Sequence, residues 1–208
     1  GTVATASDTY PADVGIKDGR IVVLGTGLGG ADRIIDASGM LVLPGGLDAH
    51  CHIEQMSSFK LMTADDFYSG SVSAAFGGTT TFVPFAVQHK GQSLRDVVRE
   101  AHDRAGPKSV IDYAFHLIVS DPSEHVMGQE LPALIMDGYM SFKVYMTYDM
   151  LKIDDREMLD ILALAREFGA ITMVHAENND VINWLSGRLL ARGYDAPKYH
   201  AVGHNAVA

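Results

Sequence analysis

The fold is decided by the stretch Pro44-Gly-Gly-Leu-Asp-Ala-His-Cys-His52, which ends the first of five apolar, strand-like runs. The five runs cover residues 41–52, 78–87, 110–120, 139–148 and 170–178. They recur about every 30 residues, which is the size of one βα unit. Helix-like segments lie between the runs, and Thr63 with Asp66 and Ser93 with Asp96 have the spacing of capping boxes. This alternation predicts an α/β protein with a parallel sheet.

Residues 1–44 have a different pattern, in which short strands are joined by tight turns. The pair Asp18-Gly19 lies between two β-favouring runs and can adopt the positive φ angles of a two-residue hairpin. A second strand pair is expected at residues 33–36 and 40–43. The sequence therefore predicts a small β domain over residues 1–44 and a larger α/β domain over residues 45–208.

Composition narrows the classes of function. The 208 residues are 47% hydrophobic and 20% charged, which is enough apolar material for a substantial core. A formal charge of -10 repels phosphate backbones and anionic lipid, so nucleic acid and membrane partners are not expected. The single cysteine excludes an internal disulfide, and no apolar run approaches the roughly 18 residues of a membrane span. No signal peptide is visible at the first residues, so a cytoplasmic location is expected.

The most specific chemical signal is the pair His50 and His52 at the end of the first run. Side chains alternate between the faces of a strand, so the two imidazoles should point the same way and Cys51 the opposite way. Two imidazoles on one face can share a metal ion, and this ligand pair fits zinc, iron, nickel or manganese. Two hydrogen-bonded structural histidines are the alternative interpretation.

A second signal closes the fourth run, where Lys143 lies inside an apolar strand and Tyr148 follows it. Burial lowers the pKa of an amine, so the free nucleophilic form of Lys143 becomes accessible and can capture carbon dioxide as a carbamate. Such a carbamate offers an anionic oxygen ligand that can bridge two metal ions. The alternative is a lysine whose ammonium group reaches solvent at the end of a strand.

The third signal is His175, which ends the fifth run before a helix. Together with His50, His52 and Lys143, it falls at the carboxyl end of a predicted strand. These ends converge in a closed (β/α)8 barrel, whereas an open doubly wound sheet is less suited to aim four side chains at one point. The convergence favours the barrel. His116, by contrast, is interpreted as a hydrogen-bonded core histidine.

With these motifs, the chain resembles the cyclic amidohydrolases, the dihydropyrimidinase and hydantoinase group of the amidohydrolase superfamily. The resemblance covers nearly all of the chain, and its motifs are residues 44–52, 77–81, 141–148 and 174–178. It implies a TIM barrel of the metal-dependent hydrolase type, of which about five βα units are present. It also implies that residues 1–44 are part of a β-sandwich domain.

The resemblance further implies a site with two divalent metal ions, usually zinc. His50 and His52 resemble ligands of one ion, carboxylated Lys143 the bridge, and His175 a ligand of the other. Tyr148 resembles the tyrosine that polarises the substrate carbonyl. The implied reaction is hydrolysis of the ring amide of a cyclic ureide, a dihydropyrimidine or a 5-substituted hydantoin, by a metal-bridging hydroxide. The family is often tetrameric, so a homo-oligomer is expected.

Some expectations concern what surrounds this site. Met56, Phe59 and Tyr145 are candidate walls of a substrate pocket beside Tyr148, and packing is the competing interpretation for each. The family's sixth-strand histidine ligand and its acid/base aspartate have no counterpart in these residues, so the chain resembles the front half of the enzyme. An allantoinase-type hydrolase, a metal-dependent deaminase or phosphotriesterase, and a non-catalytic assembly protein of the same superfamily remain the alternatives.

Overall fold

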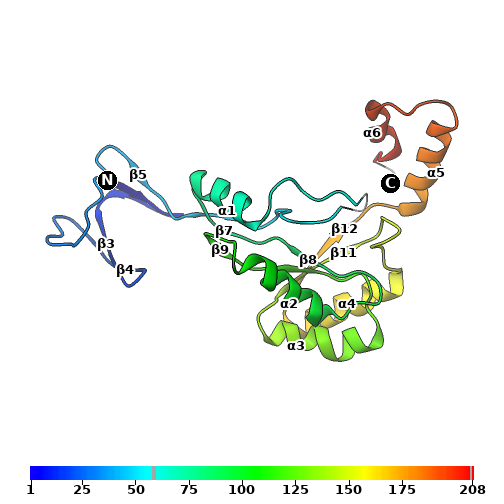
Figure 1. Cartoon of the computed structure of the whole chain (residues 1–208), viewed down its shortest axis with the longest axis horizontal. Helices are drawn as coiled ribbons and strands as arrows, with labels where there is room; N and C mark the ends of the chain where they lie inside the picture. Colours follow the sequence, from blue (N-terminus) through cyan, green and yellow to red (C-terminus); the bar gives the residue numbers. More distant parts are fainter. Residues whose placement is uncertain (58–59, 207) are drawn as a thin grey trace. The chain divides into compact units, whose positions relative to one another are not determined.

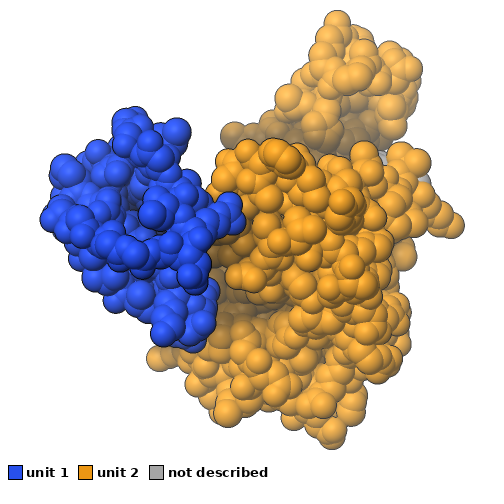
Figure 2. Space-filling view, turned by 60° about the vertical axis from the view of Figure 1, so that its left-hand side comes forward, with its two compact units in different colours: residues 1–46 blue, residues 47–208 orange. Residues whose placement is uncertain are grey.

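The computed structural model describes residues 1–57, 60–206 and 208, and it divides the chain into two compact units. The first unit comprises residues 1–46 and the second residues 47–208, against an expected boundary after residue 44 (Figure 2). Within the described ranges, no helix is both long and apolar enough to cross a lipid bilayer.

The first unit contains the hairpin that the sequence predicts. Strands β3 (Asp13–Lys17) and β4 (Arg20–Gly25) pair antiparallel, and Lys17 lies opposite Arg20. Between them, Asp18 and Gly19 have φ angles of 52° and 71°. Both central residues of a type I′ turn need positive φ, which Asp and Gly tolerate better than most residues. The prediction of a hairpin at this pair is confirmed.

The second predicted strand pair of this unit is wrong. Strand β5 (Leu41–Val42) pairs parallel with β1 (Thr2–Ala4), and β1 pairs antiparallel with β2 (Thr9–Pro11). Residues 33–36 form no strand, and the two isoleucines among them are 79% and 75% exposed. The partner of β5 is thus β1, and residues 33–36 do not pair with it.

The second unit is an α/β structure with parallel sheets (Figure 1). Its strands are β6 (Gly46–Asp48), β7 (Thr79–Phe82), β8 (Phe85–Val87), β9 (Asp112–Tyr113), β10 (His116–Ile118), β11 (Ser141–Tyr145) and β12 (Ile171–His175). They form two sheets, with the orders β6-β7-β9 and β8-β10-β11-β12. The pairs β7–β9, β8–β10, β10–β11 and β11–β12 are parallel.

The strand order follows the order of the five sequence runs. The second run is split into β7 and β8 at Val83 and Pro84, and proline cannot donate a ladder hydrogen bond. The third run is likewise split into β9 and β10. Each run lies beside the next one along the chain, and the order does not reverse as it does in a doubly wound sheet.

Helices connect the parallel strands of the second unit. They are α1 (Phe67–Phe76), α2 (Leu94–Ala105), α3 (Leu131–Met136), which continues a π-helical turn (Val126–Glu130), α4 (Asp155–Phe168), α5 (Asn179–Leu190), the 3-10 turn Pro197–Tyr199 and α6 (His200–Gly203). Helices α2, α3 and α4 lie on the same side of the strands (Figure 1). This arrangement leaves the other face of the sheet to the candidate site.

Two of these helices test the predicted caps. Ser93 caps α2, because its side chain accepts a hydrogen bond from the Asp96 amide, as predicted. The cap predicted at Thr63 is wrong. Asp66 begins α1 instead, and its carboxylate accepts from the Ser69 amide in a capping box.

The two faces of the four-stranded sheet β8-β10-β11-β12 carry different residues because side chains alternate along a strand. The face toward the helices is the main core and includes Phe82, Ala86, Leu117, Phe142 and Val144. The opposite face carries a smaller apolar cluster of Phe85, Ile118 and Tyr145, with Val87, Leu151 and Met173 packed against it. We call this opposite side the inner face.

Candidate metal centre

The His50 and His52 rings lie just beyond strand β6 on the inner face. The strand ends at Asp48, so the expectation that it continues to residue 52 is wrong. The Asp48 carboxylate accepts a hydrogen bond from the His50 amide at 3.0 Å, which turns the chain out of the ladder. The two rings are nevertheless on one side, 5.5 Å apart between centroids, while Cys51 packs against the main core. His50 and His52 share a side, opposite to Cys51, because adjacent side chains in an extended backbone point in opposite directions.

The protonation of these two histidines suits metal ligation. His52 Nδ1 lies 2.7 Å from Gln55 Oε1, and because an amide oxygen only accepts, Nδ1 carries the proton. The Nε2 lone pair of His52 is then available to an ion. Burial, followed by the neighbouring His52 and Lys143 groups, lowers the pKa of His50, which favours the unprotonated ring.

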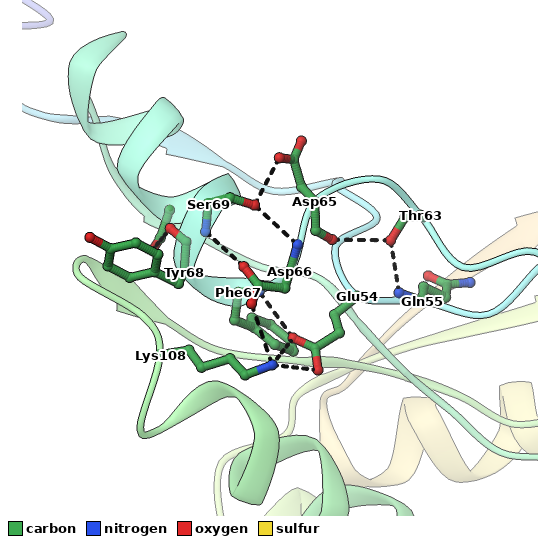
Figure 3. Close-up of polar contacts among 10 residues, drawn as sticks. Glu54, Gln55, Thr63, Asp65, Asp66, Phe67, Tyr68, Ser69 and Lys108 are labelled. Atoms are coloured by element: carbon green, nitrogen blue, oxygen red, sulfur yellow. Dashed lines mark hydrogen bonds and ion pairs between the residues drawn. The ribbon is translucent and has the colours of Figure 1, made fainter.

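The loop after His52 is tied to α1 by the partly buried carboxylate of Glu54. Glu54 has a φ of 47° and accepts a hydrogen bond from the Phe67 amide at 3.1 Å (Figure 3). Both of its oxygens also contact Lys108 Nζ, at 2.9 and 2.8 Å. These bonds raise the pKa of Lys108, and they engage both oxygens of the Glu54 carboxylate. Glu54 therefore anchors the loop and does not face the histidines as a ligand.

Lys143 lies on the inner face of β11, in register between Ile118 of β10 and Met173 of β12. Burial lowers the pKa of its amine, as expected for an apolar strand. Within the described residues, Nζ makes no hydrogen bond or ion pair and lies 5.4 Å from the centre of the Tyr145 ring. A partly desolvated amine without an anionic partner has an increased free-base fraction, which carbamate formation requires.

His175 ends β12 opposite Tyr145 of β11. Its Nε2 lies 2.5 Å from a Glu177 oxygen, and the other Glu177 oxygen lies 2.9 Å from His204 Nδ1. A carboxylate only accepts, so His175 Nε2 carries the proton and the Nδ1 lone pair remains available. Sequence reasoning missed Glu177 and His204. The signal for Glu177 was its two-residue offset from His175, but the position of His204 follows only from the path of α5 and α6.

Tyr148 and Tyr145 adjoin His175. The ring centroids of Tyr148 and His175 are 5.0 Å apart, and those of Tyr145 and His175 are 5.6 Å apart. Tyr148 is 43% exposed, with a φ of 70°, and its pKa is raised by burial and then by the charge of Glu177. Tyr145 is buried against Phe85 and Ile118. Tyr148 therefore presents a protonated hydroxyl near the site, while Tyr145 supports the ring of His175.

Of the other expected pocket residues, Met56 is 49% exposed and forms an isolated bridge with Met62, away from these rings. Phe59 lies outside the described residues. A cavity of about 570 Å³ opens beside the N-termini of α4 and α5, and its lining includes Met146 and Glu177 but not Met56 or Tyr145.

The predicted ligands fit a metal in chemistry, although they do not form a closed set. No group of three or more His, Cys, Asp or Glu side chains in the described part of the chain is arranged to hold an ion. Lysine is not one of these four residue types, but Lys143 lies near the candidate histidines. Its charge lowers the pKa of His50, and its Nζ lies over the Tyr145 ring, which stacks on His175. Imidazole nitrogens and a desolvated amine are the donors that a carbamate-bridged site needs.

Comparison with known proteins identifies the family. The model of the amidohydrolase family matches residues 41–191, which covers all five sequence runs. The chain belongs to the amidohydrolase family. The three motifs that contain the candidate ligands all lie within this match.

Individual relatives of this amidohydrolase chain are hydantoinases and dihydropyrimidinases. It is 46% identical to a D-hydantoinase of Geobacillus stearothermophilus over 97% of the chain and 43% of the relative. It is 38% identical to a dihydropyrimidinase of Rattus norvegicus over 96% of the chain and 40% of the relative. A solved D-hydantoinase structure superposes on the whole chain, which covers 45% of that structure, with a TM-score of 0.95 and 45% identity. The amidohydrolase chain thus spans less than half the length of the relatives it matches.

Proposed function

We propose that the full-length protein hydrolyses the ring amide of a cyclic ureide, a dihydropyrimidine or a 5-substituted hydantoin. The observation that carries this proposal is that four candidate ligands share the inner face: His50 and His52 follow β6, Lys143 lies within β11 and His175 ends β12. Membership of the amidohydrolase family and the names of the relatives support it. These names do not favour the non-catalytic alternative.

We also propose that the second unit is the first part of a (β/α)8 barrel, with about five βα units. The sequential order of its strands supports this proposal, because a barrel places each strand beside the next one along the chain. The first unit then corresponds to part of a β-sandwich domain, although its described strands are short and few. A cytoplasmic location, expected from the sequence, and a homotetramer, implied by the family resemblance, remain proposals.

The proposed cofactor is a pair of divalent ions, zinc by resemblance, bridged by carboxylated Lys143. Carboxylation joins Lys143 Nζ to the carbon of carbon dioxide and releases one proton, so it needs the deprotonated amine that burial favours. His50 and His52 would hold one ion, and His175 the other. When bound, the ions would lower the pKa of a coordinated water and supply a hydroxide nucleophile near neutral pH.

The chain's own groups would then orient the substrate and hold its developing charge. Tyr148 keeps its proton because its pKa is raised, so its hydroxyl can donate to the carbonyl oxygen as negative charge develops there. Glu177 holds the His175 ring through Nε2 and so fixes which nitrogen faces the site.

The residues that follow His52 support a neutral substrate. Dihydroorotase-like relatives usually have an arginine there for a substrate carboxylate, whereas this chain has Ile53, Glu54 and Gln55. None of these three side chains is cationic, and the Glu54 carboxylate and the Gln55 amide are already bound to Lys108 and His52. A neutral five- or six-membered ureide ring therefore suits the site better, with an allantoinase-type reaction as the alternative.

Metal analysis of the full-length protein tests the proposal. The wild type should contain close to two divalent ions per subunit and open the rings of dihydrouracil and hydantoin. Lys143→Ala should lose the metal pair and this activity, because it removes the bridging ligand. Lys152→Ala is the matched control. The Lys152 side chain is 39% exposed, and its Nζ makes a long ion pair of 3.7 Å with Asp149 Oδ1. Two ions retained in Lys143→Ala would remove Lys143 from the site, and a metal-loaded wild type inactive on both rings would refute the reaction.

A further inference from the structure

His116 occupies a position between the two segments that carry the candidate ligands. It is the first residue of β10, and its ring lies on the inner face against Phe85, with centroids 5.3 Å apart. Its Nε2 is 2.8 Å from the Ala49 carbonyl oxygen, and its Nδ1 is 2.5 Å from Ser141 Oγ. Both ring nitrogens are therefore engaged, as expected from the sequence, and His116 is not available as a metal ligand.

The proton positions follow from the chemistry of the partners. A carbonyl oxygen only accepts, so Nε2–H of His116 donates to Ala49. Nδ1 is paired with the Ser141 hydroxyl. A single imidazole thus joins two segments, one of which enters His50 while the other leads to Lys143.

The backbone at Ala49 depends on this bond. Strand β6 ends at Asp48, and its last ladder-like bond runs from the Val83 amide to the Asp48 carbonyl at 2.8 Å. Among the described residues, the Ala49 carbonyl accepts only from His116. The segment that carries His50 and His52 therefore leaves the sheet with His116 as its first lateral support.

The other end of the link acts on β11. Ser141 and Lys143 are two residues apart in this strand, so both project on the inner face. The His50 and His52 rings pack on Phe85 with centroid distances of 4.9 and 5.1 Å, beside the His116 ring. The two bonds of His116 thus connect the segment that carries the two imidazoles to the strand that carries Lys143.

We propose that His116 is a positioning residue that holds the His50–His52 segment at a fixed separation from Lys143. This inference rests on the proposed function, because it assumes that these side chains bind the metal pair. Groups that orient metal ligands without touching the metal typically change metal affinity by about 10- to 100-fold when they are replaced.

Two amide substitutions of different reach test the proposal in the full-length protein. The amide nitrogen of His116→Gln can approach the place of Nε2 and donate to Ala49, whereas the side chain of His116→Asn is too short. We expect His116→Asn to lose metal to a chelator at least about tenfold faster than the wild type. His116→Gln should recover most of that factor. Ser141→Ala, which leaves the bond to Ala49 intact, should accelerate metal loss by a smaller factor than His116→Asn.

Further readouts separate positioning from a general structural role. Positioning predicts that kcat falls more than KM changes in His116→Asn, while the unfolding temperature of the metal-free protein stays near the wild-type value. Wild-type rates of metal loss in His116→Asn would overturn the inference. Equal acceleration in the Asn and Gln variants, with a lowered metal-free unfolding temperature, would also overturn it. A wild type without bound metal would instead refute the proposed function itself, and this inference with it.

Discussion

A neutral imidazole binds a metal through one lone pair, and its hydrogen bonds decide which ring nitrogen keeps that pair. At His52 the bond to Gln55 leaves Nε2, and at His175 the bond to Glu177 leaves Nδ1. The two candidate ligands thus differ in the nitrogen they offer. The sequence contains all four residues, but the choice of nitrogen follows only from contacts made in the folded chain.

Tyr148 supplies a prediction at the same scale. Removal of its hydroxyl in Tyr148→Phe should lower kcat about a hundredfold or more, because a donor to the developing oxyanion is lost. The metal content should not change, since the hydroxyl is not a proposed ligand. Steady-state kinetics with metal analysis measures both, and Tyr68→Phe, at an exposed position, is the control. Unchanged kcat in Tyr148→Phe would exclude the hydroxyl from the reaction.

At the scale of single elements, a local sequence pattern predicts structure well where few residue types can adopt the required backbone conformation. The Asp18-Gly19 hairpin is confirmed, because its turn needs positive φ at both positions. Residues 33–36 have an equally strand-like composition, yet they form no strand, and β5 pairs with β1 instead. The cap of α1 moves from Thr63 to Asp66 since only Asp66 reaches the Ser69 amide. Pairing partners and helix starts thus depend on neighbours that a local pattern does not include.

Glycines in α4 and α5 give a matched prediction for helix stability. Gly169 ends α4 with a φ of 73°, while Gly187 lies inside α5, and a Cβ at either would meet no atom within 4 Å. Gly169→Ala should destabilise the protein by about 1 kcal/mol, because an L side chain disfavours positive φ. Gly187→Ala should stabilise it by up to about 1 kcal/mol, because alanine favours helix. Denaturant unfolding of both variants measures the difference, and changes of the same sign would contradict the assignment.

At the scale of the whole molecule, the candidate ligands come from separate elements. His50 and His52 follow β6, Lys143 lies in β11 and His175 ends β12. A metal pair held by these residues would cross-link segments that are far apart in the chain. Its binding free energy would then appear as stability of the whole protein.

Metal removal tests this linkage. Chelation should lower the unfolding temperature of the full-length protein, and added metal should restore it. At free metal a thousandfold above the dissociation constant, the lost stability would be about 4 kcal/mol for each ion. Calorimetry with and without chelator measures the shift, and Lys143→Ala should show a much smaller one. An unfolding temperature that chelation leaves unchanged would contradict a metal bound across these strands.

The sequence by itself determined what local backbone geometry controls: the five strand-like runs, the hairpin, and the shared side of His50 and His52. Side-chain alternation and turn conformation follow from covalent geometry within a few residues, so a local pattern is sufficient to predict them. Only the tertiary structure decided that His116 joins Ala49 to Ser141 and that Glu54 binds Lys108. Such contacts join residues tens of positions apart, and they form only when packing of the core has brought distant segments together.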